Sequence, residues 1–400
     1  MSKAIDDRLE AIVNRQEEIN LYVLNLIAER VKETKEIIPS DVYKIERLIK
    51  SGNDVRKINK LIAKIAGISV KEIEKLIYEV AKESYADTLP FYEYRKMKFI
   101  PFYKNKELQR VCQSIAKQTV DSYLNIAKAQ AFMLRDEVTK KLIPTTIANA
   151  YQKTLDKAIQ ALQQGTLSYD KAMKSTLKEL VDSGLKTVTY HPESGRVYSQ
   201  RLDTAVRRNL LDGVRAINQG VQDITGQQFG ADGVEITVHS NPAPDHCNCQ
   251  GHQFTNEEFE KMQNEMSFVD VQGRQYKSFQ RAIGTLNCRH FTYSIIVGVT
   301  NPNYSDEQLK EILNKNEKGV TISIKGKSTH LTMYECTQKQ RDYELKIRQL
   351  RERLQVAEKA QNSELISETK AKLSDNLKEY QMFSVKCGLK SRLNKTLLII

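Results

Sequence analysis

Helical periodicity is the feature of this 400-residue sequence that most restricts how it can fold. In residues 42–84, 106–164, 168–183 and 203–225, apolar side chains recur at three- and four-residue steps, the spacing of one face of an α-helix. The same spacing governs residues 5–31, where the apolar positions include Leu9, Ile12, Val13, Ile19, Tyr22, Val23 and Leu26. The sequence therefore predicts a protein built mainly of helices.

Local breaks divide the first 90 residues into several short helices. Residues 51–54 are a turn-forming run, and Ser69 forms a capping box with Glu72 at the start of a new helix. We therefore expect helices of three to four turns in this region. A further break is expected at 143–145, where a proline interrupts the helical pattern of 106–164.

Alternating apolar and polar residues predict a few short strands. Single strands are expected at 234–239 and 291–297, and hairpins at 187–190 with 196–198, around a turn at 193–195, and at 319–324 with 327–333. The predicted fold class is mainly α with a small α+β central domain. The expected parts are an N-terminal helical bundle at 1–90, a helical region at 91–185, the central domain at 186–330 and a basic C-terminal helical hairpin at 331–400.

The C-terminal region carries much of the positive charge. The chain has 62 Lys and Arg against 50 Asp and Glu, a net charge of +12, and residues 325–400 contain 16 basic and nine acidic residues. Such patterning in a helix usually marks a solvated face, here folded back by a loop at 362–363. A basic balance fits proximity to nucleic acid without specifying it. The candidate DNA contacts are Lys339, Arg341, Arg348, Arg351 and Arg353.

Residues 85–105 combine aromatic side chains, prolines and cations. Because Pro90 and Pro101 stop helices, we expect an extended connector. Its aromatic residues, interleaved with lysines and an arginine, could stack on nucleic acid. They could also pin the connector to neighbouring helices, which is the interpretation we favour.

Composition places the chain in a reducing compartment. Six cysteines in 400 residues do not form a disulfide scaffold. The N-terminus is charged from its third residue, and no apolar run approaches the roughly 20 residues of a membrane helix. The expected site of synthesis is a reducing cytoplasm, with no membrane partner.

Four of the six histidines and three of the six cysteines lie between positions 239 and 290. A tetrahedral zinc site could use Cys247, Cys249 and Cys288 with His246, His252 or His290. We take His290 as the candidate fourth ligand. The spacing argues against it, because Cys247 and Cys249 are separated by one residue and structural zinc sites usually have two or more. No cofactor is expected, with zinc as the possible exception.

Three other interpretations remain open for this cluster. Asp245 and His246, followed by Asn287 and His290, resemble the residue types of a metal-dependent nuclease, and Cys288 beside His290 has those of a cysteine nucleophile. The third, which we favour, is a structural cluster of hydrogen-bonded polar side chains between two strands. Its members would be His239, Asp245, His246, Gln250, Gly251, Asn287, Cys288, Arg289 and His290.

Four runs of this sequence resemble phage minor capsid proteins, of the minor capsid protein 2 type related to the MuF-like head morphogenesis family. The most specific are residues 238–254, which end in Gln250-Gly251-His252-Gln253-Phe254, and residues 287–298, which begin Asn287-Cys288-Arg289-His290. Residues 101–105 and 334–344 carry further similarity. The chain departs from the pattern where Cys249 replaces a tryptophan.

This resemblance implies a structural protein of a tailed phage and not an enzyme. Its central domain would be MuF-like, and the protein would lie in the virion near the portal after assembly in the host cytoplasm. The implied partners are the portal protein, other capsid components and, non-specifically, the packaged double-stranded DNA. The implied role is to assist head assembly and DNA packaging or ejection.

Overall fold

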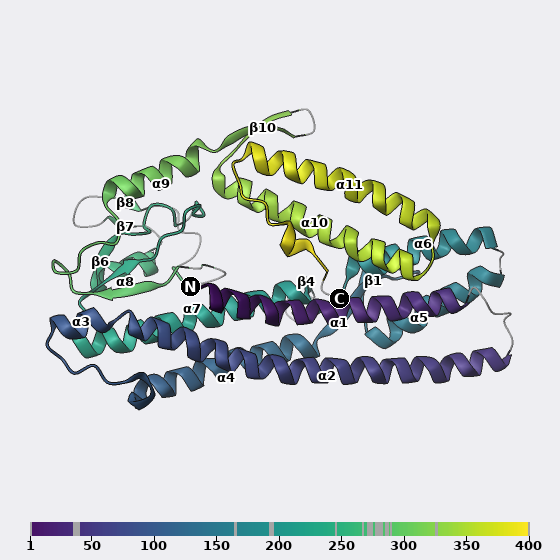
Figure 1. Cartoon of the computed structure of the whole chain (residues 1–400), viewed down its shortest axis with the longest axis horizontal. Helices are drawn as coiled ribbons and strands as arrows, with labels where there is room; N and C mark the ends of the chain where they lie inside the picture. Colours follow the sequence, from purple (N-terminus) through teal and green to yellow (C-terminus); the bar gives the residue numbers. More distant parts are fainter. Residues whose placement is uncertain are drawn as a thin grey trace.

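Most of the chain folds into long helices that run side by side (Figure 1). The computed structural model describes residues 2–34, 41–163, 166–191, 196–244, 246–265, 268–269, 275–276, 283–284, 288, 290–324 and 327–398. The prediction of a mainly α fold with small β elements is confirmed.

Four helices form the main bundle: α1 (Lys3–Thr34), α2 (Asp41–Ala86), α4 (Lys106–Lys128) and α7 (Leu202–Phe229). Their apolar faces meet in one buried core that contains Ile12, Ile77, Tyr123, Leu210 and Ile217. A second core joins α1 and α2 to α5 (Ile147–Gln163) and α6 (Thr166–Ser183). The helical periodicity thus identified the faces that pack together.

The expected breaks in the first 90 residues are wrong, because α2 continues through both. At the first, Asp54 is buried and accepts hydrogen bonds from Arg30 and from the Tyr151 hydroxyl. At the second, Ser69 is buried beside Gln16 instead of capping a helix. A glycine inside a helix costs about 1 kcal/mol, and these tertiary contacts outweigh local signals of that size.

Residues 130–145 form a hairpin where a helix with one break was expected. Strands β1 (Gln130–Arg135) and β2 (Leu142–Thr145) pair antiparallel, and the sheet order is β2-β1-β3-β4. The interior of β1 is buried on both faces, which produces an apolar run that periodicity alone does not distinguish from a helix. The predicted hairpin of β3 (Lys186–His191) and β4 (Arg196–Arg201) is confirmed, and its turn at 193–195 lies outside the described residues.

The aromatic connector is only partly extended. It contains helix α3 (Leu89–Tyr94) and the 3-10 turn η1 (Phe102–Lys104). Phe99 stacks on Tyr85 of α2 with ring centroids 4.4 Å apart, and Phe91 stacks on Phe229 of α7 at 4.8 Å. The interpretation that aromatic side chains pin this segment to neighbouring helices is therefore confirmed.

A small three-stranded sheet lies against the C-terminal part of α7. Its order is β6 (Gln253–Thr255), β5 (Gly233–Ile236), β9 (Thr292–Ile295), and the strands are shorter than predicted. The side chains of Gln219 and Gln222 bind the backbone of β9, and Ser294 packs closely on Gly226. Near this sheet lie α8 (Asn256–Glu265), α9 (Asp306–Lys318) and the short pair β7 (Phe268–Val269) and β8 (Gln275–Tyr276).

The C-terminal region begins with the predicted hairpin, β10 (Val320–Ile324) and β11 (Lys327–Leu331). A capping box between Thr332 and Glu335 starts α10 (Met333–Lys359). The chain then reverses into α11 (Ser363–Lys386) and ends in the 3-10 turn η2 (Leu393–Thr396). The predicted antiparallel helix pair is confirmed, but α10 is not a solvated helix, because it packs on α1 and α6 and buries Glu352 and Arg353.

Candidate functional site

The histidines and cysteines singled out in the sequence meet at one end of the small sheet. His239 follows β5 and His290 precedes β9, and these strands pair antiparallel with Ile236 opposite Thr292. The backbone N–H of Thr237 extends the pairing by donating to the carbonyl of Phe291 at 3.0 Å. The topology therefore brings together two segments that are about 50 residues apart in sequence.

Three of these side chains form a buried triad, His246, Cys288 and His290. The Sγ atom of Cys288 lies 3.2 Å from Nδ1 of His246 and 3.4 Å from Nδ1 of His290. The three residues are at most 4% exposed. A sulfur between two imidazole nitrogens can take part in hydrogen bonding, in metal binding or in proton transfer.

Gln250 connects the triad to the loop that follows β5. Its amide nitrogen donates to the carbonyl of His239 at 3.1 Å, and its Oε1 accepts from the N–H of His239 at 2.8 Å. The same Oε1 lies 3.3 Å from Nε2 of His290. Gly251 follows with a φ of 75°, and a side chain there would meet Leu309 at 2.4 Å. The structure thus unites five residues of the predicted polar cluster with Gly251, while Asp245, Asn287 and Arg289 lie outside the described residues.

The chemistry of Cys288 differs from that of the buried thiols Cys112, Cys336 and Cys387. Burial raises the pKa of Cys288, whereas the hydrogen bond with His246 and two backbone contacts lower it. Together these contacts outweigh burial, so the pKa of Cys288 lies below its usual value. By contrast, burial raises the pKa of Cys112 to about 11 and that of Cys336 to about 12. The thiolate is the form that binds metals and attacks electrophiles, so Cys288 is the thiol that its surroundings prepare for either task.

The structure places two of the predicted zinc ligands, Cys247 and Cys249, in hydrogen bonds to the backbone. Cys247 Sγ donates to the carbonyl of Pro244 at 3.2 Å, and Cys249 Sγ donates to that of His246 at 3.4 Å. Cys249 also packs in the core of the small domain. Among the described residues, the group of potential ligand atoms consists of His246, Cys288 and His290, without Cys247 or Cys249.

The triad faces an open cavity of about 630 Å³ between α7, the loop after β5, and α10. His239 and the three triad residues line one side. Arg208, Arg341 and Arg392 line it as well, together with Asp212. The cavity wall therefore carries more positive than negative groups, which favours the binding of anions.

Of the five candidate DNA contacts, Arg341 alone is exposed. Arg353 is 3% exposed and pairs with Asp182, Arg348 is 15% exposed and pairs with acidic groups of the bundle, and burial lowers the pKa of the half-buried Arg351. Arg348 and Arg353 therefore connect α10 to the rest of the protein and are not presented to solvent as free cations. Lys339 and Arg341 lie nearer the surface, with Arg341 exposed.

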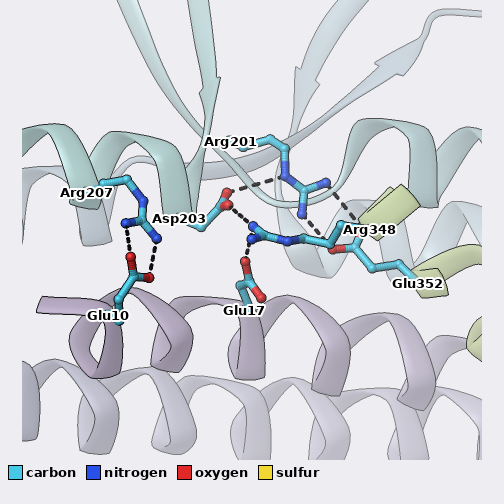
Figure 2. Close-up of polar contacts among 7 residues, drawn as sticks. All are labelled: Glu10, Glu17, Arg201, Asp203, Arg207, Arg348 and Glu352. Carbon is cyan, nitrogen blue, oxygen red and sulfur yellow. Dashed lines mark hydrogen bonds and ion pairs between the residues drawn. The ribbon is translucent and has the colours of Figure 1, made fainter. Parts of the chain in front are cut away.

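An ionic network that no sequence pattern indicated joins α10 to α1 and α7 (Figure 2). Arg348 donates to Glu17 of α1 and, at 2.9 Å, to Asp203 of α7. Arg201 donates to both oxygens of Glu352, at 2.7 and 3.3 Å, and at 3.3 Å to Asp203. These five side chains are between 1% and 15% exposed. The partners lie up to 331 residues apart in sequence, so no local sequence pattern could predict their pairing.

A neighbouring pair extends the network along α1 and α7. Arg207 donates to both carboxylate oxygens of Glu10 at 2.6 Å each, the two-pronged geometry that suits a guanidinium group (Figure 2). In the sequence, Arg207 lies on the polar face of a helix whose other face is apolar, and nothing marks Glu10 as its partner. The network is therefore a structural feature of the interface between the C-terminal hairpin and the bundle.

Comparison with known proteins agrees with the resemblance seen in the sequence. Among the described residues, no helix combines the length and apolar content needed to cross a membrane. No curated protein and no solved structure matches the chain. The family model described as phage minor capsid protein 2 matches residues 3–383, nearly the whole chain. The chain therefore belongs to the phage minor capsid protein 2 family.

Proposed function

We propose that this virion protein is a non-catalytic connector at the portal vertex, where it assists head assembly and DNA packaging or ejection. The observation that carries the proposal is how the reactive side chains are used. Gln250 and His290 are buried and join the loop after β5 to the segment before β9. Side chains that close a fold in this way act as structural ties.

The proposed partners are the portal protein and other capsid components. The family places the chain among virion components. The C-terminal helix pair stands above the bundle in Figure 1 and exposes apolar side chains on α11, with Met382 73% and Val385 81% exposed. A helix bundle whose outer helix pair exposes apolar side chains suits attachment to a larger assembly.

Replacing His290 by alanine should lower the melting temperature and reduce co-purification with the portal protein of the same phage. The change removes one hydrogen-bond partner from each of Gln250 and Cys288, at a cost of about 1–3 kcal/mol for the two bonds. His330→Ala is the matched control, because His330 is exposed on β11. Differential scanning fluorimetry and size-exclusion chromatography of the co-expressed pair measure both effects.

The alternative is a metal-dependent nuclease or another enzyme built on residues 239–290, and the cavity beside the triad favours it. A catalytic role predicts a different result in complemented phage. His290→Ala protein would then be stable and fully incorporated, and would yield particles that fail only after assembly. That outcome would overturn the structural role, and so would failure of the wild-type protein to bind the portal.

We also propose weak, sequence-independent contact with DNA through Lys339 and Arg341 on the first turns of α10. Lys339→Gln with Arg341→Gln should weaken duplex binding and flatten its salt dependence, since each lost phosphate contact removes about one counterion from the slope. Lys71→Gln with Lys82→Gln, two exposed positions of α2, makes the same charge change elsewhere. Fluorescence anisotropy over a series of salt concentrations measures the slope.

Point variants are preferable to removing residues 334–400, because α10 is tied to the bundle by buried ion pairs. Equal losses in the two double variants would show that binding follows net charge and that α10 is not the contact. An unchanged slope in the Lys339 and Arg341 variant would have the same meaning.

A further inference from the structure

We propose that His246, Cys288 and His290 bind one transition-metal ion of the zinc class. The three side chains each offer one ligand atom, and these atoms all lie within 4.8 Å of one another. All three residues are buried, at 1%, 4% and 3% exposure. They come from two loops held together by β5 and β9, so the fold itself assembles the donor set.

The spacing of the donors fits coordination by a small ion. Zinc lies about 2.3 Å from a cysteine sulfur and about 2.0–2.1 Å from an imidazole nitrogen, so tetrahedral angles place sulfur and nitrogen roughly 3.6 Å apart. The separations from Cys288 Sγ are 3.2 Å to His246 Nδ1 and 3.4 Å to His290 Nδ1. The sulfur and each nitrogen need to separate by only a few tenths of an ångström to accept the ion.

The surroundings of His290 select the tautomer that a metal requires. The amide of Gln250 is held in one orientation, because its nitrogen donates to the His239 carbonyl and its oxygen accepts from the His239 N–H. That oxygen faces Nε2 of His290 at 3.3 Å, so Nε2 carries the hydrogen. Nδ1 is then left with a lone pair directed at Cys288. An outer partner that orients a ligating histidine in this way is a usual part of metal sites.

The donor types narrow the choice of ion. A thiolate with two imidazoles suits zinc, cobalt and similar ions, whereas magnesium and calcium prefer carboxylates, carbonyls and water. Three protein ligands leave one tetrahedral position for water or for a ligand from the adjoining cavity. The cavity of about 630 Å³ that all three residues line provides space for that fourth ligand, and its three arginines favour an anionic one.

Cobalt(II) provides a spectroscopic test on the full-length, metal-free, reduced protein. One equivalent should produce a thiolate-to-cobalt charge-transfer band and the intense visible bands of a tetrahedral ion, and one equivalent of zinc should displace it. Cys288→Ser should abolish the charge-transfer band. Cys247→Ser is the matched control and should keep it, because that thiol bonds to the Pro244 carbonyl. Gln250→Leu should weaken cobalt binding by about 10–100-fold.

The cobalt spectrum of the wild-type protein tests the proposal even if a variant fails to fold. Absence of the charge-transfer band at one equivalent of cobalt would overturn the proposal, as would an octahedral spectrum without sulfur. Loss of the band in Cys247→Ser with retention in Cys288→Ser would move the site to other cysteines and also overturn it. Retention in Cys247→Ser with loss in a folded Cys288→Ser, checked by circular dichroism, would support the proposal and identify Cys288 as the sulfur ligand.

Discussion

Replacing Arg348 by methionine is expected to lower the free energy of unfolding by about 3–5 kcal/mol. Arg348 is the cation of α10 that reaches both Glu17 of α1 and Asp203 of α7. Its removal leaves two carboxylates, 3% and 8% exposed, with less compensating positive charge. Methionine keeps much of the aliphatic volume, so the effect reports mainly the lost charge. Urea unfolding at pH 8 followed by circular dichroism measures it.

Lys359→Met is the control, because Lys359 joins the same two helices through Glu29 at the surface. That pair is 49% and 44% exposed, and surface ion pairs contribute about 0–1 kcal/mol. A large loss in both variants would mean that any link between α10 and α1 matters equally. A loss below about 1 kcal/mol for Arg348→Met would show that the buried network does not hold the hairpin in place.

Much of the helical framework followed from periodicity, because the apolar face of a helix is a local pattern. The helix at Leu202–Phe229, the hairpin at Lys186–Arg201 and the reversal before Ser363 were all predicted. The errors occurred where tertiary contacts override local signals, as at Asp54 in the interior of α2. The buried strand β1 was missed because an apolar run has no period to distinguish strand from helix.

The composition of the candidate site was partly predictable and its geometry was not. The concentration of histidine and cysteine between positions 239 and 290 located the cluster. Residue type suggested Cys247 and Cys249 as zinc ligands despite their tight spacing, whereas backbone carbonyls accept hydrogen bonds from both thiols. Which thiol faces His246 depends on the turn at 246–250, and that turn is set by contacts of Gln250 with the backbone of His239.

The ionic network was beyond prediction because charge patterning reports only neighbours along the chain. Arg348 and Glu352 are spaced as a surface pair on one helix, yet both point to partners on other elements. Figure 2 shows that its seven residues supply four carboxylates and three guanidinium groups. With every group ionised the set carries one excess negative charge, and such an excess is costly away from water.

The pKa of Glu17 and that of Glu352 are both raised in this network, mainly by burial. Burial raises the pKa of Glu17, the attraction of Arg348 lowers it, and repulsion from Asp203 and Glu352 raises it again, to about 7 from a usual value of 4.5. A carboxyl group with a raised pKa stabilises the fold fully below its unfolded-state pKa, and that stabilisation is lost as pH rises through the folded-state value. The stability of the protein should therefore contain a term that declines between about pH 4.5 and pH 7.

Glu17→Gln should remove this decline, because glutamine resembles the protonated acid and still accepts a hydrogen bond from Arg348. Each unit of pKa shift corresponds to about 1.4 kcal/mol, so above pH 7 the variant should be more stable than wild type by about 3 kcal/mol. Below about pH 4.5 the two should converge. Glu29→Gln, which alters the surface pair with Lys359, should show no such pH dependence. Urea unfolding from pH 4 to pH 8.5 gives the three curves. A Glu17→Gln protein less stable than wild type at pH 8 would mean that the Arg348 ion pair outweighs the repulsion, and that the network does not retain a proton.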